Sequence, residues 1–479
     1  MDVSATICIF EDKKHTNFLP LSLARPVFDL RIGCGSLRSR LLDGLPGAQL
    51  SLICREYLAD VVRIESPRAV VNDARPGATL FVNGRWLHLG AERERILAQL
   101  EEGVVAVKGG YVVAARLPAT AAAEFAGYLI RRVSPVAVEE MCDALRAAAG
   151  EGGETPRRKK AASRSSVPPA GTYENENVIG QDSFEEKLPL EVEAIIERHR
   201  LRRVETPEAR LLSFPWQLIE FNPEVIGDDF SRSPVRGQAE DCVIYPGVHS
   251  VDSARVVIGE KAVIRSGVVL DATGGPVIIG DHAVVMPNAT LVGPVSIGAG
   301  SIVKAGARIL DGTSVGPVCK IGGEVAETIF AAYSNKQHDG FIGNSYIGEW
   351  VNIGAASNNS DLKNNYSGVR MWCAGSERET GRQFLGLLMG DHTKTGINTL
   401  FNTGTVVGFN CNIFSSELPR KFVPSFSWGH GETMIPYDLD KAMQTAAVVM
   451  ERRDVRFSAA HRALFSSLFK ISERCGGNV

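Results

Sequence analysis

The most regular pattern in the chain is an aliphatic residue at every sixth position. Positions 279, 285, 291, 297, 303, 309, 315 and 321 hold Ile, Val, Leu, Ile, Val, Ile, Val and Ile. The residue four positions after each is small or of modest size, and the template recurs around Ile258, Phe341 and Phe401. A helix repeats every 3.6 residues and a simple strand every two, so neither produces this pattern. A period of six predicts a parallel β-helix, in which three short strands form each triangular coil and the aliphatic residues stack inside.

The first 150 residues instead alternate short apolar runs with stretches of helical periodicity. The expected strands are rich in Val and Ile, and they are Thr6–Phe10, Leu50–Cys54, Ala69–Val71, Thr79–Val82, Val104–Val107 and Tyr111–Ala114. The expected helices are Leu37–Leu42, Ala91–Leu100 and Thr120–Ile130. Such alternation predicts an α/β layer fold with a largely parallel sheet.

Changes in composition divide the chain into five parts. An α/β domain is expected at 1–149, a Gly-, Pro-, Ser- and basic-rich linker or insertion at 150–185, and a helical remainder of the first domain at 186–235, with a predicted helix at Leu188–His199. The β-helix is expected at 236–430 and a helical tail at 431–479. In that tail, Tyr437–Arg452 and Ala459–Ile471 are predicted helices that cap the solenoid or reach over a cofactor.

Charge and cysteine content narrow the class of protein. Lys and Arg total 52 against 55 acidic residues, and the formal net charge of −3 argues against a nucleic-acid partner. No apolar run approaches the roughly 18–20 residues that span a bilayer, and the N-terminus lacks a secretion pattern. We therefore expect a cytoplasmic protein without a membrane partner. The nine Cys contain no CxxC motif, so neither a disulfide framework nor a zinc ribbon is expected.

The hexads pause twice, and pauses in a solenoid predict insertions that leave the stack. The pauses fall at 322–340 and at about 355–396, and both are rich in Asn, His, Lys, Asp and Tyr. His338 lies in the first pause, near Lys336 and next to Asp339. An imidazole with an ordinary pKa of about 6.5 suits proton abstraction from an amine. Asn residues also occupy left-handed backbone corners, which is an alternative role for many of those present here.

Around His338 the chain resembles the bifunctional family that combines N-acetylglucosamine-1-phosphate uridylyltransferase with glucosamine-1-phosphate acetyltransferase. The similar segments are YSNKQHDGFIGNSYIGEWVNIGAASNN and the NNY at 364–366. LPLSLARPVFDLRIG and MGDHTKTGINTLFNTGTVVG are closer still to an alternative bacterial branch of such proteins. The resemblance implies a nucleotidyltransferase-like α/β domain, a left-handed parallel β-helix of hexapeptide repeats and C-terminal helices.

For the β-helix, the resemblance implies acetyl transfer from acetyl-CoA to glucosamine-1-phosphate. His338 matches the family's catalytic base, which deprotonates the sugar amine. The implied substrate-binding residues are Asn335, Lys336 and Asn352, and the implied cofactor-binding residues are Asn365, Tyr366 and Lys394. Two positions depart from the family: Lys336 is one residue closer to the His, and Phe341 stands where a Tyr is frequent.

For the N-terminal half, the resemblance implies nucleotidyl transfer from UTP, which yields UDP-N-acetylglucosamine and pyrophosphate. The family's Gly-x-Gly-Thr-Arg loop is absent, and FEDKKHTNFLPLSLARP and DLRIGCG stand in its place. The candidate nucleotide or phosphate ligands are Lys13, Arg25, Arg31 and Asn83. Arg85 occupies the place of a metal-binding Asp, which leaves Asp228, or Asp229 beside it, as the candidate for Mg²⁺.

Several functions remain open at this stage. The N-terminal domain either transfers a nucleotide, to this or another sugar-1-phosphate, or only binds sugar or nucleotide beside an active acyltransferase. A zinc hydratase requires three His at coil-related spacing, and His249, His282, His338 and His392 are widely separated. A noncatalytic trimeric scaffold is the last alternative. The resemblance and the flat faces of a three-sided prism both predict a homotrimer with active sites between subunits.

Overall fold

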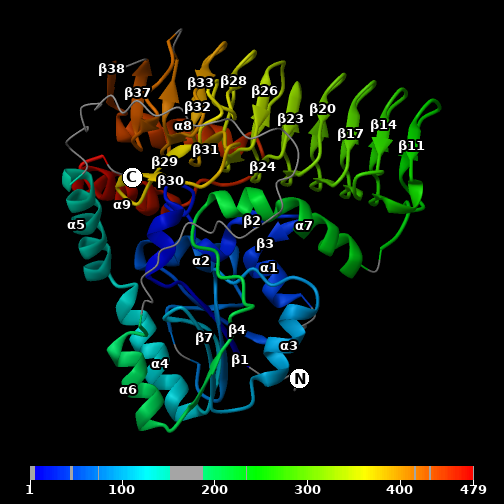
Figure 1. The fold of residues 1–479 in the computed structure, drawn as a ribbon. Coiled ribbons are helices and arrows are strands. Elements are labelled where there is room, and N and C mark those ends of the chain that lie inside the picture. Colours follow the sequence, from blue (N-terminus) through cyan, green and yellow to red (C-terminus); the bar gives the residue numbers. More distant parts are fainter. Residues whose placement is uncertain are drawn as a thin grey trace, which may run out of the picture.

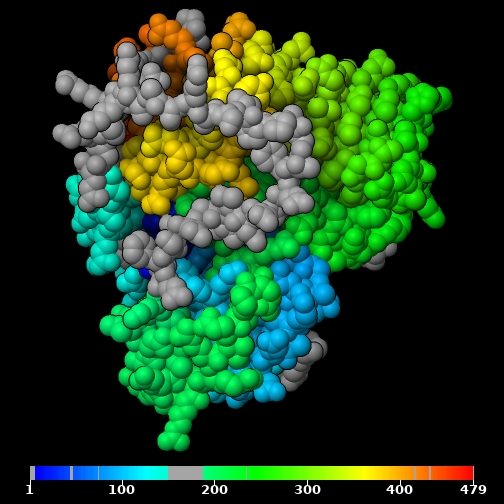
Figure 2. Space-filling model, in the orientation of Figure 1, coloured from blue at the N-terminus to red at the C-terminus, as the bar shows by residue number. Residues whose placement is uncertain are grey.

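The structure, a computed structural model, consists of an α/β domain lying against one side of a long solenoid of strands (Figure 1). It describes residues 6–43, 47–73, 75–151, 187–233, 235–414, 417–430, 433–477 and 479. The expected linker at 150–185 therefore lies outside the described residues, apart from its first two positions, which end a helix. The first coils of the solenoid project past the α/β domain (Figure 2).

The N-terminal domain is built on a seven-stranded sheet in the order β5-β4-β1-β6-β8-β7-β9. Its strands are β1 (Thr6–Phe10), β4 (Gln49–Ile53), β5 (Val70–Val71), β6 (Thr79–Asn83), β7 (Val104–Lys108), β8 (Tyr111–Leu117) and β9 (Arg202–Glu205). Only β8 is antiparallel to its neighbours, so the expected, largely parallel α/β sheet is confirmed. Strand β9 comes from the segment expected to be helical, and its RRVE sequence holds a single apolar residue.

Helices cover the faces of this sheet. They are α1 (Leu37–Leu42), α2 (Ala59–Glu65), α3 (Ala91–Gln99), α4 (Ala119–Arg132), α5 (Pro135–Glu151), α6 (Leu190–Arg198) and α7 (Trp216–Arg232). Short 3-10 turns and a two-strand ribbon complete the domain: η1 (Lys13–Phe18), η2 (Val27–Asp29), η3 (Glu56–Leu58), β2 (Arg31–Ile32) and β3 (Gly35–Ser36). Helix α4 buries Ala122, Phe125, Ala126 and Leu129, the spacing of one helical face.

The solenoid is a left-handed parallel β-helix with three faces. The first face is one nine-stranded sheet: β12 (Val256–Ile258), β15 (Val277–Ile279), β18 (Val295–Ile297), β21 (Thr313–Val315), β24 (Ile329–Phe330), β27 (Tyr346–Ile347), β31 (Leu387–Met389), β34 (Thr405–Val407) and β36 (Phe422–Val423). The eight hexad positions from 279 to 321 are each no more than 2% exposed, which confirms that they form the interior of the prism.

The other two faces are built in the same way. The second face holds β10 (Val243–Ile244), β13 (Val263–Ile264), β16 (Val284–Val285), β19 (Ile302–Val303), β22 (Lys320–Ile321), β25 (Asn335–Lys336), β32 (Lys394–Thr395), β35 (Asn412–Ile413), β37 (Ser427–His430) and the antiparallel β38 (Thr433–Pro436). The third face holds β11 (His249–Val251), β14 (Val269–Asp271), β17 (Thr290–Val292), β20 (Arg308–Ile309), β23 (Glu324–Ala326), β26 (Phe341–Gly343), β28 (Asn358–Asn359) and β33 (Leu400–Phe401). A 3-10 turn, η4 (Ser253–Arg255), joins two early coils.

The expectation that residues 322–340 leave the stack is wrong. Strands β23, β24 and β25 pair with the coils on either side, and β26 pairs with β23. Eighteen residues separate the registered partners Val303 and Ile321, but only fifteen separate Ile321 and Lys336. Gly322 and Gly323 lead directly from the second face to the third, so this coil lacks the usual corner. The pause marks a shortened coil rather than an insertion.

The second pause does leave the stack. Between β28 and β31 the chain forms an antiparallel hairpin of β29 (Arg370–Cys373) and β30 (Ser376–Glu379). This hairpin folds back onto the N-terminal domain of the same chain. Met371 and Trp216 belong to one buried cluster, and the Cys373 Sγ lies 3.3 Å from the carbonyl oxygen of Asn17.

The N-terminal domain covers the first face of the β-helix. From β24 to β34 the outward side chains of this face are apolar and buried against the domain, and they include Ile329, Tyr346, Leu388 and Val406. At one edge of this contact, Asn222 on α7 donates through its side chain to the carbonyl of Gly312 at 2.7 Å. The two halves of the chain therefore share one continuous apolar interface.

The C-terminal tail forms two helices, as the sequence predicts: α8 (Leu439–Glu451) and α9 (Ala459–Arg474). Phe465 on α9 packs against Phe409 and Phe426 at the corner between the first and second faces. Helix α9 also contacts α2 and η3 of the N-terminal domain. None of the helices described is long and apolar enough to cross a membrane.

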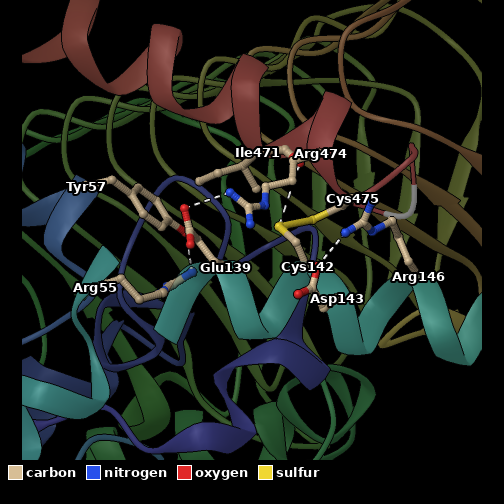
Figure 3. The surroundings of a disulfide bond; sticks show 9 residues. All are labelled: Arg55, Tyr57, Glu139, Cys142, Asp143, Arg146, Ile471, Arg474 and Cys475. Carbon is tan, nitrogen blue, oxygen red and sulfur yellow. Dashed lines mark hydrogen bonds and ion pairs between the residues drawn. A yellow bond between two sulfur atoms is a disulfide. The ribbon is translucent and has the colours of Figure 1, made fainter. Parts of the chain in front are cut away.

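A disulfide connects the N-terminal domain to the C-terminal helices, contrary to the expectation that the cysteines form no disulfide. Cys142 on α5 is bonded to Cys475, which directly follows α9 (Figure 3). An ion pair between Arg474 and Glu139, at 2.7 Å, connects the same two helices. The partners are 333 residues apart, so their pairing carries no local sequence signal.

Candidate functional site

Polar side chains run along the second face of the β-helix in register. We call Lys320, Asn335, Asn352, Lys394 and Asn412 the polar ladder. Each pairs with the next across adjacent coils. Neighbouring strands lie about 4.8 Å apart, so these side chains project side by side from one surface. The sequence assigned three of these residues to two different ligands, and the structure brings those three together.

The two-residue strands explain why the polar ladder faces outward. In each strand the second residue points into the prism, and Ile321, Ile353 and Ile413 are at most 3% exposed. Successive residues of a strand point to opposite faces, so the residue before each of them lies outside. In the earlier coils the outward column is apolar, with Val243, Val263, Val284 and Ile302 in register.

Helix α8 adds a residue that the sequence did not indicate. Arg453, two residues beyond the end of α8, donates a hydrogen bond from its Nη2 to the Oδ1 of Asn335 at 2.8 Å. The two residues are 118 positions apart and belong to different elements, so no motif connects them. The contact places the carboxyl end of α8 over the polar ladder.

Lys336 points into the prism, in the column of inward aliphatic residues, and is 1% exposed. Its Nζ donates to the carbonyl oxygen of His338 at 2.7 Å. Burial lowers the pKa of Lys336 to about 8, against a smaller opposing effect of Asp339. The amine of Lys336 is therefore enclosed and already bonded, which does not favour its expected contact with sugar or phosphate.

This buried amine makes stability depend on pH. In the unfolded chain the lysine regains a pKa near 10.5, so between about pH 8 and 10.5 the unfolded state binds more protons and stability rises with pH. We expect Lys336→Met to raise the melting temperature at pH 7, partly offset by the lost hydrogen bond. The gain should shrink as the pH approaches 10.5. Melting curves at both pH values test this, and the exposed Lys261→Met serves as the control. A lower melting temperature at pH 7 would contradict it.

His338 lies at the corner between the second and third faces, directly above the shortened coil. Its side chain is exposed, and within the described part of the chain its ring makes no hydrogen bond or ion pair. Asp339 is also exposed and does not orient the imidazole. The catalytic base implied by the sequence is thus open to a ligand at a corner adjacent to the polar ladder.

The implied cofactor residues do not lie together. Asn365 and Tyr366 are on the insertion between β28 and β29, where Tyr366 is 67% exposed. Asn365 accepts a hydrogen bond from the backbone of Ser367, and Gln383 donates to the carbonyl of Tyr366. Lys394, in contrast, is on the polar ladder.

An aromatic column supports the polar ladder from the corner between the first and second faces. Tyr333 and Trp350 stack with their ring centroids 4.1 Å apart, and His392 stacks on Trp350 at 6.0 Å. Burial, and to a lesser degree Lys394, lowers the pKa of His392. Lys394 donates from its Nζ to the carbonyl of His392 at 2.6 Å, and burial lowers the pKa of Lys394 to about 8.

Arg25, which the sequence proposes as a phosphate ligand, connects the two halves of the chain. Its Nη1 lies 2.6 Å from Glu349 and its Nη2 lies 2.5 Å from Asp391. The backbone N–H of Glu349 also donates to Asp391 at 2.8 Å. These two carboxylates stand three residues before Asn352 and Lys394, respectively. An arginine of the N-terminal domain therefore holds the two turns that lead into the polar ladder.

We expect Arg25→Met to destabilise the fold by about 3–5 kcal/mol at neutral pH, because it leaves Glu349 and Asp391 facing each other in a buried site. Urea unfolding measures this loss. Arg63→Met is a matched control, since it removes an exposed pair with Asp60 that contributes less than about 1 kcal/mol. Equal effects of the two substitutions would show that the buried pair has no special role.

In the N-terminal domain, the order in which the chain forms the strands of the sheet indicates where a crevice lies. From β1 the chain proceeds to β4 and β5 on one side, and it then returns to β6 on the other side. Ligands of open α/β sheets bind outside the carboxyl ends of the strands at such a switch point. A pocket lies at this position, lined by Asp12, Lys13, Asn83, Tyr111, Tyr128 and Arg132 among others.

The polar groups at the back of this crevice are bonded to one another. Asn83 is fully buried, and it donates to Asp12 at 2.8 Å and to the carbonyl of Val112 at 3.0 Å. Arg85 donates to both oxygens of Asp12. Burial alone raises the pKa of Asp12, but the charge of Arg85 lowers it overall. Asn83 thus serves the domain's internal network while it also lines the pocket, and its role as a nucleotide ligand stays a prediction.

Neither the crevice carboxylate Asp12 nor Asp228, which the sequence proposes for Mg²⁺, is free of ion pairs. Both oxygens of Asp12 accept hydrogen bonds from Arg85. Asp228, the sequence candidate, is paired with Arg40 at 2.5 Å and Arg232 at 2.8 Å, and its other oxygen accepts from the backbone of Gly90. Among the residues that the structure describes, no three His, Cys, Asp or Glu side chains are grouped to hold a metal. These contacts do not favour the metal role expected of Asp228.

The remaining phosphate candidates lie in different places. Lys13 lines the crevice, with its Nζ 5.7 Å from the ring centroid of Tyr111. Arg31 lies at the contact between the two halves of the chain, where its backbone N–H donates to the hydroxyl of Tyr346 at 2.8 Å and its Nη1 donates to Cys34. Of the four sequence candidates, Lys13 alone combines a cationic side chain with a place in the crevice.

Comparison with known families agrees with this architecture. Residues 7–149 match the family model described as sugar nucleotidyl transferase, and residues 276–311 match bacterial transferase hexapeptide (six repeats). The chain thus has one segment similar to sugar nucleotidyl transferases and another similar to hexapeptide-repeat transferases, in agreement with the resemblance seen in the sequence.

Individual relatives are more distant. A bifunctional sugar-1-phosphate nucleotidylyltransferase/acetyltransferase from Sulfurisphaera tokodaii is 27% identical over 221 residues, 46% of each chain. The bifunctional protein GlmU of Nocardia farcinica is 32% identical over 200 residues, 38% of this chain and 36% of that protein. The chain therefore matches less than half the length of either relative. A UDP-N-acetylglucosamine acyltransferase structure from Campylobacter jejuni aligns to 49% of this chain and 93% of its own at 15% identity, with a TM-score of 0.21.

Proposed function

We propose that this chain transfers an acetyl group from acetyl-CoA to the amine of glucosamine-1-phosphate on the second face of its β-helix. The observation that carries this proposal is the polar ladder, which brings Asn335, Asn352 and Lys394 onto one surface beside the exposed His338. Its relatives named as acetyltransferases support the same reaction class.

In this reaction His338 acts as the general base. It accepts a proton from the sugar amine as the nitrogen attacks the thioester carbonyl. The new C–N bond forms, the C–S bond breaks, and coenzyme A leaves with a proton on its sulfur. Asn335 and Asn352 suit recognition of sugar hydroxyls, because each amide offers both donors and an acceptor. Lys394 lies on the same surface with its amine bonded to the carbonyl of His392 at 2.6 Å, and we propose that it contacts the acyl donor by exchanging this bond.

Nucleotidyl transfer from UTP to a sugar-1-phosphate is the second candidate activity. The family match over 7–149 and the crevice with Lys13 and Arg132 favour it. With N-acetylglucosamine-1-phosphate the products would be UDP-N-acetylglucosamine and pyrophosphate. Because Asp12 and Asp228 are each paired with an arginine, we derive no step through a metal. A domain that binds sugar or nucleotide without transfer is the alternative.

We further propose that the chain forms a homotrimer. The outward column of the early coils on the second face is apolar, and Val243 there is 46% exposed. The N-terminal domain covers the first face, so this column stays available to a second copy. Light scattering during size-exclusion chromatography tests the proposal, since a trimer has three times the 51.7 kDa mass of the chain. A monomer mass at micromolar concentration would contradict it.

The two other functions considered from the sequence, a zinc hydratase and a noncatalytic scaffold, are less well supported. His338 and His392 lie at different corners of the prism, and His392 is enclosed by aromatic rings, which argues against a zinc hydratase.

An assay of the reaction products distinguishes an enzyme from a noncatalytic scaffold. Purified protein is incubated with glucosamine-1-phosphate, acetyl-CoA, UTP and Mg²⁺, and the products are identified by mass spectrometry. N-acetylglucosamine-1-phosphate supports acetyl transfer, and UDP-N-acetylglucosamine supports both activities. An unchanged mixture counts against both with these substrates.

A further inference from the structure

We propose that Lys304, Lys320, Arg452 and Arg453 form a binding site for a phosphate ester between the β-helix and the end of α8. This inference rests on the proposed acyltransferase function and names the part of the ligand that the second face recognises. The phosphate is carried by the sugar acceptor or by coenzyme A, and the experiment below distinguishes these two sources.

The four cations come together from two separate parts of the chain. Lys320 and Asn335 are registered partners on adjacent strands, and Arg453 donates to the Asn335 side chain at 2.8 Å. The backbone N–H of Lys304 donates to the carbonyl of Ile321 at 2.8 Å, which places Lys304 beside the strand that carries Lys320. Arg452 precedes Arg453 and caps the carboxyl end of α8.

The charge of this cluster is not compensated by carboxylates. In the described part of the chain, none of the four side chains forms an ion pair with Asp or Glu. Burial lowers the pKa of Lys320, and the positive charges of Arg453, Lys304 and Arg452 lower it further. The carboxyl end of a helix carries a partial negative charge, which accounts for the two arginines but not for the two lysines. Such a concentration of like charge is favourable when an anion binds.

The shortened coil connects this cluster with the proposed base. A side chain at Gly322 would lie 3.1 Å from the Cβ of Lys304, and one at Gly323 would lie 2.9 Å from the carbonyl oxygen of His338. Both glycines belong to the coil that begins with Lys320. The missing corner therefore leaves the cationic cluster and His338 at the same edge of the prism. A phosphate ester held by the cluster would keep the rest of the ligand within reach of His338 and the polar ladder.

The experiment is isothermal titration calorimetry with the full-length protein and four probes. Glucosamine-1-phosphate is compared with glucosamine, and coenzyme A with pantetheine, so each pair differs by its phosphate groups. We expect Lys320→Met and Arg453→Met to weaken binding of one phosphate-containing probe about tenfold or more, because each removes a charge-assisted contact. Binding of the matching phosphate-free probe should not change. The pair that responds identifies the source of the phosphate.

Further variants separate a loss of charge at the cluster from other effects on binding. Arg453→Lys retains the charge and should retain most of the affinity, whereas Lys261→Gln removes an exposed cation far from the cluster and should have no effect. Lys320→Gln replaces Lys320→Met if the latter does not fold. The proposal is overturned if the cluster variants bind both phosphate-containing probes as the wild type does, or if the wild type binds neither. Because calorimetry needs no turnover, phosphate binding without acetyl transfer would reject the proposed function and leave the site intact.

Discussion

Replacing His338 with Ala is expected to slow acetyl transfer about 10²–10⁴-fold, the usual contribution of a positioned general base. The side chain is exposed and makes no hydrogen bond or ion pair among the described residues, so the fold should not change. The contact that this residue does make, from the Nζ of Lys336 to its carbonyl oxygen, belongs to the backbone and survives the substitution. The measurement is steady-state release of coenzyme A with glucosamine-1-phosphate as acceptor.

His249→Ala is the matched control for this substitution. His249 is also exposed, on the third face of the first coil, and its removal should leave the rate unchanged. A loss confined to kcat, with little change in KM, would indicate a role in the chemical step rather than in binding. Wild-type turnover by the His338 variant would remove this residue from the mechanism.

Replacing Ile297 with Asp is expected to unfold the β-helix or to destabilise it by more than about 4 kcal/mol. Ile297 is 2% exposed and lies in the middle of the inward column, between Ile279 and Val315 on adjacent coils. A carboxylate at this position loses its hydration and gains no partner inside the prism. Because each coil buries its interior against its neighbours, the defect should spread along the stack. Circular dichroism during heating measures the loss.

Val269→Asp provides the control, since it also replaces an aliphatic side chain of the β-helix with a carboxylate. Val269 is on β14 of the third face and points outward, whereas its neighbour Leu270 points inward and is 1% exposed. We expect this variant to melt close to the wild-type temperature. If Ile297→Asp also melted like the wild type, the assignment of the hexad positions to the interior would be wrong.

The β-helix could be predicted in detail because its repeat is local. Every coil depends on the same short pattern, so each inward residue from 279 to 321 is found where the period places it. The pauses could not be interpreted so well. A gap in the pattern looks the same whether the chain leaves the stack, as it does before β31, or only shortens a corner, as it does at Gly322 and Gly323. Strand pairing distinguishes the two cases, and it is a non-local property.

Part of the candidate site could also be predicted, because some of its residues follow the local repeat. Asn335, Asn352 and Lys394 stand at equivalent places in the repeat, and the structure aligns them. Arg25 was assigned to phosphate because its ion-pair partners lie 324 and 366 residues away and are invisible in its own motif. Arg453 was missed for the corresponding reason. Contacts between separate elements decide which charged side chains are free for a ligand, and no local pattern reports them.

The disulfide between Cys142 and Cys475 gives the chain the topology of a ring. It joins two residues that are 333 positions apart, so the ring includes every coil of the β-helix, and it connects the end of α9 to α5 of the first domain (Figure 3). A single protease cut anywhere within this ring opens the backbone without dividing the molecule, and the two pieces separate on a gel only after reduction. An ordinary solenoid can fray from either end. Here the carboxyl end has no free terminus to unravel while the bond is intact, so the stack should lose its last coils only as part of a wider opening of the ring.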